Sequence, residues 1–215
     1  ERGLLAAVSH ELRTPLARIR LLVEIGRQGA AGGPPQLDEI EREAIEIDAL
    51  VGELLASARL EFQAVTPKPL DAVEVARRAL DRAGESAAKL QAPPGSVPLG
   101  ADPTLLARAL ANLIDNARKH GGGLQRLAVS ASQGDADRGW VVFTVTDGGP
   151  GFAPGDEARV FDRFYRGAGG GHAHGSLGLG LSLVKRIADA HGGRVSAANQ
   201  PGGGARLVLE LPPGI

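Results

Sequence analysis

Apolar residues near the start of the chain recur every three or four positions. The recurring positions are Leu5, Val8, Leu12, Ile19 and Leu22, with Pro15 in the fourth place. This spacing predicts an apolar stripe along one face of a helix over residues 1–28. The Gly- and Pro-rich residues 28–35 break that helix.

A second helix is predicted over residues 36–62, with a strict heptad pattern. Its apolar positions are Leu37, Ile40, Ala44, Ile47, Val51, Leu54 and Ala58. Two such helices joined by a short loop form an antiparallel hairpin. Because one hairpin cannot bury both stripes, we expect two chains to pair as a four-helix bundle, which makes the protein a homodimer.

The pattern changes after the Pro-rich residues 66–69, which we interpret as a domain boundary. We expect a helical domain at 1–64 and a mixed α/β domain at 65–215. Helices are predicted at 72–89, from Asp102-Pro103 onward and at 179–191, and Asp102 is expected to cap the second of them. Strands are predicted at 125–132, 139–146, 194–199 and 205–211.

Composition excludes several classes of function. The 215 residues include no Cys, which rules out disulfides, thiolate catalysis and Cys-ligated zinc. Aromatic residues make up only 3% and no basic cluster interleaves with them, so we expect no nucleic-acid binding. No apolar run approaches the roughly 20 residues of a membrane span, and no signal peptide is visible. We therefore expect a cytoplasmic fragment without membrane contact, whose full-length protein could carry a membrane anchor.

The first predicted helix places His10 away from its apolar stripe, at about 100° of rotation per residue. Thr14 follows one turn later on the same side, and Glu11 is the next residue in the chain. An imidazole beside a carboxylate can act as a nucleophile, because the carboxylate holds one ring nitrogen protonated. A lone exposed His usually has no chemical role, so the surrounding sequence decides between these interpretations.

The α/β domain carries three groups of polar residues with candidate chemistry. On the helix after Asp102, the oxygen-bearing amides Asn112 and Asn116 lie on one flank with Lys119; amide oxygens suit Mg²⁺, and a Lys can neutralise phosphate. Asp147 shares the apolar face of its strand, where a carboxylate needs a partner such as the adenine amino group. The turn at 178–180 opens a helix, and helix amides bind anions.

These segments resemble the motifs of sensor histidine kinases and follow the family's order over nearly the whole chain. The matching segments are SHELRTPL at 9–16, NLIDNARKH at 112–120, DGGPG at 147–151, VFDRFYR at 160–166 and GLGLSLVKRIADAHGG at 178–193. The departures are His120, where the family usually has an aromatic residue, and Leu177, where it often has a small one. The resemblance implies a helical dimerisation hairpin followed by an α/β sandwich of the GHKL type, with a mixed sheet covered by helices on one face.

The resemblance also implies the roles of single residues. In the hairpin, His10 would be the phosphoacceptor, Glu11 the general base, and Thr14 a residue used in dephosphorylating the partner. In the ATP-binding domain, Asn116 would hold Mg²⁺ and Arg163 would reach the γ-phosphate, with Arg166 as the alternate. The remaining nucleotide-binding residues would be Asn112, Lys119, Asp147, Gly149, Gly151, Gly178, Leu179 and Gly180.

The function expected from this resemblance is ATP-dependent autophosphorylation of His10, followed by transfer to an Asp on the receiver domain of a response regulator. One alternative is a nucleotide-binding module that docks the regulator and acts only as a phosphatase. Another is an ATPase of the wider superfamily, with water as acceptor. The stimulus, the regulator, transfer within or across the dimer, and the roles of His120, His172 and His174 stay open.

Overall fold

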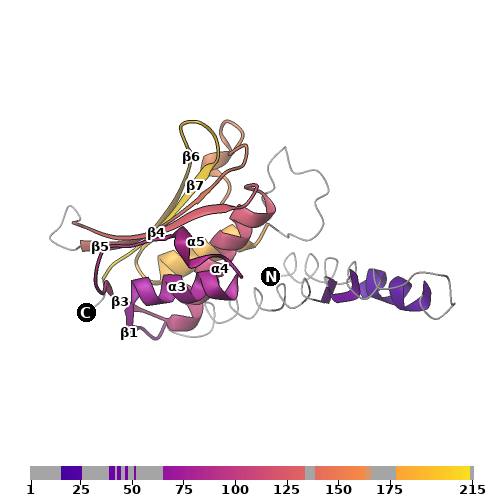
Figure 1. The fold of residues 1–215 in the computed structure, drawn as a ribbon, viewed down its shortest axis with the longest axis horizontal. Coiled ribbons are helices and arrows are strands. Elements are labelled where there is room, and N and C mark those ends of the chain that lie inside the picture. The colour runs from indigo at the N-terminus through magenta and orange to yellow at the C-terminus, as the bar shows by residue number, and fades with distance from the viewer. Residues whose placement is uncertain are drawn as a thin grey trace. The chain divides into compact units, whose positions relative to one another are not determined.

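The computed structural model describes residues 16–25, 39–41, 43, 44, 47, 51, 65–133, 139–163, 165 and 178–213. The chain divides into two compact units (Figure 1). The described residues from 16 to 51 belong to the first unit, and those from 65 to 213 belong to the second. The boundary predicted at residue 64 lies outside the described residues and stays a prediction.

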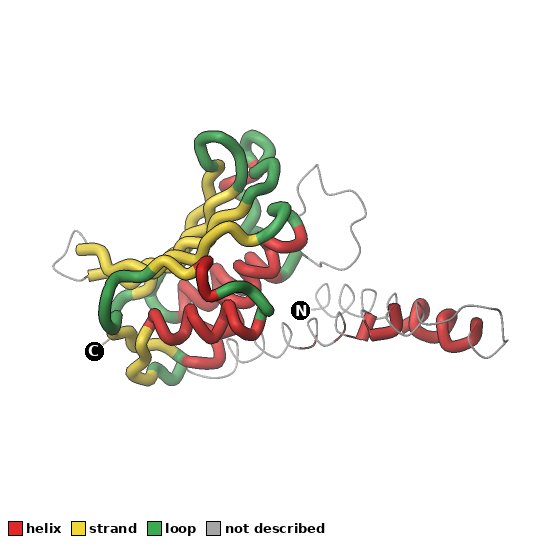
Figure 2. The backbone as a smooth tube through the Cα atoms, in the orientation of Figure 1, coloured by secondary structure: helices red, strands yellow, loops and turns green. Residues whose placement is uncertain are grey.

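The first unit is helical wherever it is described (Figure 2). Residues 16–25 form one helical segment, and the described residues between 39 and 51 are also helical. The Arg18 guanidinium lies 3.1 Å from the Glu43 carboxylate, so the two segments contact each other as in a hairpin. Four large apolar side chains of this unit, Leu16, Leu21, Val23 and Val51, are between 39% and 59% exposed.

The second unit is built on a five-stranded mixed sheet with the order β2-β4-β5-β7-β6. Its strands are β2 (Leu90–Gln91), β4 (Leu124–Gln133), β5 (Gly139–Asp147), β6 (Arg194–Asn199) and β7 (Ala205–Leu211). The β2–β4 pair is parallel and the other pairs are antiparallel. A separate antiparallel pair joins β1 (Lys68–Asp71) to β3 (Pro98–Ala101).

Three helices lie on one face of the sheet, as Figure 1 shows. They are α3 (Ala72–Arg82), α4 (Pro103–Lys119) and α5 (Gly180–Ala190), with short 3₁₀ turns η1 (Ala87–Lys89) and η2 (Asp156–Ala158) between them. This arrangement is the α/β sandwich that the sequence predicts, with helices on one face of a mixed sheet.

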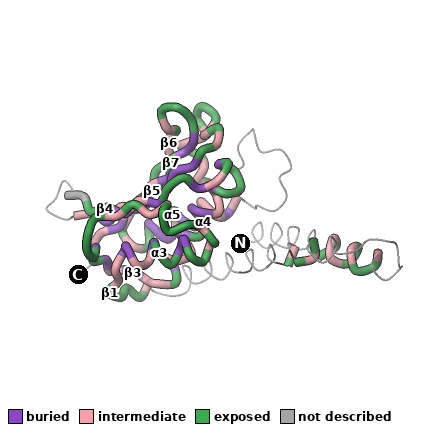
Figure 3. The backbone as a smooth tube through the Cα atoms, viewed as in Figure 1, coloured by how far each residue is buried: buried purple, intermediate pink, exposed green. Residues whose placement is uncertain are grey.

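The core lies between these helices and the sheet (Figure 3). Alternate residues of β5 and β7 point into it, as a strand period of two requires. The predicted stripe of α4 packs against them and is fully buried; it comprises Leu106, Ala109, Leu110, Leu113 and Ala117. Burial of this stripe is the main stabilising contribution of α4.

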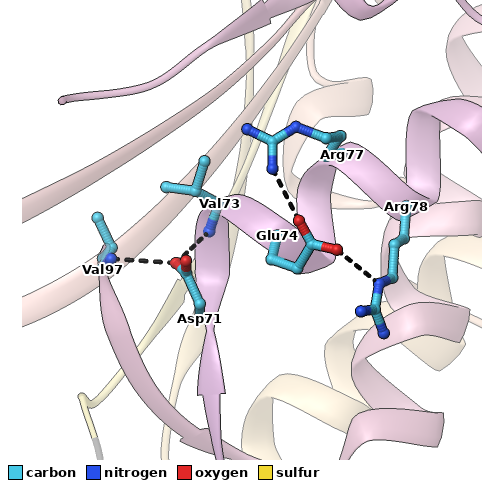
Figure 4. Close-up of polar contacts among 6 residues, drawn as sticks. All are labelled: Asp71, Val73, Glu74, Arg77, Arg78 and Val97. Carbon is cyan, nitrogen blue, oxygen red and sulfur yellow. Dashed lines mark hydrogen bonds and ion pairs between the residues drawn. The ribbon is translucent and has the colours of Figure 1, made fainter. Parts of the chain in front are cut away.

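The first two helices of the second unit, α3 and α4, each begin at an Asp. Asp102 Oδ1 accepts hydrogen bonds from the amides of Thr104 and Leu105, which confirms the predicted N-cap of α4. Asp71 caps α3 through the Val73 amide at 3.0 Å and also accepts a bond from the Val97 amide at 3.1 Å (Figure 4). The second bond ties the start of α3 to the chain entering β3.

The helix predicted over 72–89 is too long. α3 ends at Arg82, and Gly84 then takes φ 67°, which reverses the chain before Ser86 caps the short turn η1. Left-handed backbone at a glycine is a common way to end a helix. The short strands β1, β2 and β3 were not predicted, since two to four residues carry too little alternation to recognise.

Candidate functional site

Asp147 lies at the end of β5 and is only 3% exposed. Its Oδ1 accepts hydrogen bonds from the amides of Gly149, at 3.1 Å, and Ala205, at 2.9 Å. The prediction that this Asp shares the buried face of Val141, Phe143 and Val145 is therefore confirmed. The protein itself supplies partners for Oδ1, so burial alone does not require a ligand. Among the described residues, both bonds fall on Oδ1, which leaves Oδ2 for another donor.

Glycines surround Asp147 because backbone approaches it closely from two sides. A Cβ on Gly121, just after α4, would lie 2.3 Å from the Asp147 Cγ, and a Cβ on Gly149 would lie 2.7 Å from the Gly121 Cα. The Gly148 amide also donates to the Gly121 carbonyl at 3.0 Å. The resemblance implies that Gly149 binds the nucleotide, which stays a prediction. The described contacts show that Gly149 also makes room for the backbone just after α4.

Asn112, Asn116 and Lys119 occupy different environments on α4. Asn112 is buried, and its side-chain amide donates to the Gly180 carbonyl at 3.1 Å, which joins α4 to the first residue of α5. Asn116 is partly exposed and makes no side-chain hydrogen bond to another described residue. Lys119 is exposed and pairs with Asp115 at 3.2 Å. Asn116 is therefore the better of the two amides for a hydrated metal ion.

The start of α5 presents backbone amides without a side-chain cap. Gly178 takes φ 64°, and Leu179 is the N-cap residue. The Ser182 hydroxyl donates to the Leu179 carbonyl at 2.8 Å and so does not cap the amides. Uncapped amides at the positive end of a helix suit an anion such as a phosphate.

The segment around Arg163 is anchored by aromatic side chains. Phe161 packs on the core, and the Tyr165 hydroxyl donates to the Asp156 carboxylate. That bond raises the pKa of Tyr165 above its ordinary value, because ionisation would break it. The Arg159 guanidinium lies 4.5 Å from the centre of the Tyr165 ring. Arg163 itself is exposed in the turn between these anchors.

Several predicted site residues cannot be placed. His10, Glu11, Thr14 and Arg166 lie outside the described residues, as do His172 and His174. Within the described part of the chain, no group of three or more His, Cys, Asp or Glu side chains could hold a metal ion. Nor does that part contain a helix that is both long and apolar enough for a bilayer.

Sequence reasoning missed two residues beside the site. Asn199, the last residue of β6, hydrogen-bonds to Phe152 in the loop after β5. Gln200, the next residue, donates to the carbonyl of Asp147 at the end of β5. Their only signal in the sequence is a pair of amides before the Pro201-Gly202-Gly203-Gly204 turn, which by itself indicates no more than a hairpin.

Comparison with known proteins identifies the class. Residues 101–215 match the family model described as histidine kinase-, DNA gyrase B- and HSP90-like ATPase, and residues 1–63 match the His kinase A phosphoacceptor domain. The chain belongs to the two-component sensor histidine kinases. An ATPase domain of this type implies ATP binding.

Individual relatives agree with this assignment. The sensor histidine kinase CpxA of Escherichia coli K12 is 33% identical over 220 residues, which cover 99% of this chain and 47% of CpxA. The chain thus spans about half the length of that relative. The solved structure of the mycobacterial sensor histidine kinase MprB has a TM-score of 0.56 and 30% identity, covering 67% of this chain and 97% of that one.

A third similar structure is that of histidine kinase ThkA in complex with the response regulator protein TrrA. It has a TM-score of 0.70 and 19% identity, and covers 98% of this chain and 61% of that one. At this identity the likeness is one of fold.

Proposed function

We propose that the protein is an ATP-dependent kinase that phosphorylates its own His10 and passes the phosphoryl group to an Asp of a response regulator. The observation that carries the proposal is the linkage of three features in the second unit. Gly121 connects the end of α4 to the Asp147 loop, and Asn112 connects α4 to the uncapped start of α5. The carboxylate that can bind the nucleotide base and the helix amides that can bind its phosphates thus belong to one hydrogen-bonded framework.

In this proposal the nucleotide lies between these features. Asp147 accepts a hydrogen bond from the adenine amino group, beside the backbone of Gly149 and Gly151. At the other end, the phosphates meet the amides of residues 178–180, with Asn112 and Lys119 nearby. Among the described residues, Lys119 pairs only with Asp115, and both side chains are about half exposed, so Lys119 can turn toward phosphate at little cost.

The residues of α4 also fit a magnesium ion. The Asn116 amide oxygen is a hard ligand on a partly exposed side chain, and Mg²⁺ retains several waters when it binds so few protein groups. When bound, Mg²⁺ would offset the negative charge of the phosphates. Arg163 supplies a further positive charge toward the γ-phosphate.

The reaction itself is an in-line displacement at the γ-phosphorus. A ring nitrogen of His10 forms the new P–N bond while the bond to the β-phosphate oxygen breaks and ADP leaves. Glu11 accepts the proton from the other ring nitrogen as charge develops on the imidazole. In the second reaction the P–N bond breaks and a regulator Asp oxygen forms the acyl phosphate. Thr14 serves a separate reaction, in which water hydrolyses that acyl phosphate and inorganic phosphate leaves.

Two observations support the proposed partners. The exposed apolar side chains of the first unit would be covered if two hairpins formed a four-helix bundle, as a phosphoacceptor domain implies. The similar kinase ThkA forms a complex with a response regulator, and we propose the same kind of partner here. Light scattering at micromolar concentration tests the dimer, and a monomeric mass would contradict it.

The kinase proposal is tested by incubating the protein with γ-labelled ATP and Mg²⁺. We expect acid-labile, base-stable label on the protein, lost in His10→Gln and in Asn116→Ala. His174→Gln is the matched control and should keep the label. ATP binding without label would instead favour the regulator-docking module that acts only as a phosphatase. Release of labelled phosphate without labelled protein would favour an ATPase.

A further inference from the structure

We infer that Asn199 and Gln200, adjacent residues at the end of β6, are positioning residues for recognition of the nucleotide base. They hold Asp147 and the glycine loop that follows it, and we call the pair the amide brace. The inference rests on the proposed binding of adenine at Asp147. It adds two residues that the sequence motifs do not include.

Gln200 holds the backbone of Asp147. Its side-chain nitrogen donates to the Asp147 carbonyl at 3.0 Å and to the Ala205 carbonyl at 3.3 Å. The Ala205 amide in turn donates to the Asp147 Oδ1 at 2.9 Å. The backbone and the carboxylate of Asp147 are therefore held from the two sides of the β6–β7 turn, by Gln200 and Ala205. A Cβ on Gly204 would lie 2.1 Å from the Asp147 carbonyl oxygen, so only a glycine permits this approach.

Asn199 holds the other end of the glycine loop. Its Oδ1 accepts from the Phe152 amide at 2.6 Å, and its Nδ2 donates to the Phe152 carbonyl at 2.9 Å. The same Nδ2 donates to the Glu157 carboxylate at 3.2 Å, a charge-assisted bond. A Cβ on Gly151 would lie 2.4 Å from the Asn199 Oδ1, which explains why this position needs a glycine apart from any contact with adenine.

The two contacts bracket the loop that carries the base-binding groups. Gln200 holds it at residue 147 and Asn199 holds it at residue 152, while the Gly149 amide between them bonds the Asp147 carboxylate. The direction of the Asp147 Oδ2 is thereby fixed before a nucleotide binds, which lowers the entropy cost of binding. In the described part of the chain, neither amide hydrogen-bonds to α4 or α5. Loss of the brace should therefore impair base recognition more than phosphate binding.

The test compares two nucleotides that differ at one group. Purine riboside triphosphate lacks the exocyclic amino group of ATP and keeps its sugar and phosphates. If Asp147 accepts from that amino group, the unmodified protein should prefer ATP by about 10–100-fold in Kd, as a bond to a charged acceptor allows. The variants are Gln200→Glu and Asn199→Asp, which keep the side-chain shape but remove the donor.

We expect each variant to lose most of that preference for ATP. The added negative charge should weaken both nucleotides equally. Beyond that shared effect, the Kd for ATP should rise about tenfold and the Kd for the analogue should change by less than about threefold. Gln91→Glu, on the exposed end of β2, makes the same charge change and should keep the full preference. Gln200→Met removes the donor without adding charge, and serves if Gln200→Glu fails to fold. Trp140 fluorescence, from the single Trp of the chain, verifies folding.

Two results would overturn the inference alone, and a third would overturn it together with the adenine role of Asp147. An unchanged preference in folded variants means that the brace does not position Asp147. Equal weakening of both nucleotides means that its role is only structural. If the unmodified protein shows no preference for ATP over the analogue, Asp147 does not recognise the adenine amino group, and the inference fails with that role. The label on His10 would still test the kinase proposal separately.

Discussion

Replacement of Asp71 by Ala should destabilise the second unit by about 2–4 kcal/mol at neutral pH. The carboxylate caps α3 through Val73 and ties the buried Val97 amide to the helix start (Figure 4). Loss of an N-cap costs about 1 kcal/mol. A buried amide left without a partner costs about 1–3 kcal/mol more. Because a domain of this size is stable by only about 5–15 kcal/mol, the change should be easy to measure.

Urea unfolding followed by Trp140 fluorescence is the suitable assay. The chain has one Trp, in β5, so the signal reports the second unit whatever the helical hairpin does. With an m-value of about 2 kcal/mol per M, the loss should lower the midpoint by about 1–2 M. Asp71→Asn is the matched control, because Asn still accepts a bond and is a good N-cap; it should lose less than half as much.

Acid should reduce the difference in unfolding free energy between the unmodified protein and the Ala variant. The hydrogen bond from the Val97 amide, followed by that from Val73, lowers the pKa of the folded Asp71 carboxyl below its ordinary 3.8. A lowered pKa means that the stabilisation is complete above pH 3.8 and is lost as the pH falls through the folded value. The reasoning would be refuted if this difference in unfolding free energy were the same at neutral pH and well below pH 3.8. It would also be refuted if the urea midpoint of the Ala variant at neutral pH equalled that of the unmodified protein.

Three further substitutions test single contacts. Tyr165 is the only Tyr of the chain, so tyrosinate absorbance reports its pKa directly. That pKa should lie above 10.0, and Asp156→Asn should lower it toward 10.0. The hydrogen bond to Asp156 stabilises the fold below pH 10.0, and this stabilisation is lost as the pH rises through the pKa of the folded protein. His191→Phe removes the acceptor of the Asp102 amide, a 3.0 Å bond, and should cost about 1–3 kcal/mol in urea unfolding, with equal stability contradicting the contact. Gly204→Ala places a Cβ 2.1 Å from a backbone carbonyl oxygen at φ 90°, and should lower both the urea midpoint and the affinity for ATP.

Elements governed by neighbouring residues could be predicted from the sequence. The strands at 194–199 and 205–211 have the predicted bounds, because each alternates apolar and polar positions and glycine-containing segments separate them from their neighbours. The N-cap at Asp102 was equally predictable, since an Asp-Pro pair before a helical stripe meets the local requirements of a helix start. In both cases the deciding interactions span only a few residues.

Features that depend on distant contacts could not be predicted. The pairing of β1 with β3 joins residues about 30 positions apart, and neither strand alone has a recognisable pattern. Asp147 was expected to need a partner such as the adenine amino group. No local residue indicated that the Ala205 amide, 58 residues away, would also bond it. The hydrogen bond from Asn112 to the Gly180 carbonyl spans 68 residues. The motif around Asn112 therefore indicates the role that the resemblance implies, but it does not indicate this hydrogen bond.

The two ends of the proposed nucleotide site differ in how many of their polar groups are already bonded. At the base end, the Asp147 Oδ1 has two amide partners, and the amide brace holds the loop on both sides. At the phosphate end, the start of α5 has no side-chain cap, so its amides have most to gain from an anion. Binding energy should therefore come mainly from the phosphates, and selectivity from the carboxylate whose direction is already fixed. Substitutions in the brace and at the start of α5 should then have different effects. Those in the brace should change the selectivity for the base, and those at the start of α5 should change the affinity for every nucleoside triphosphate.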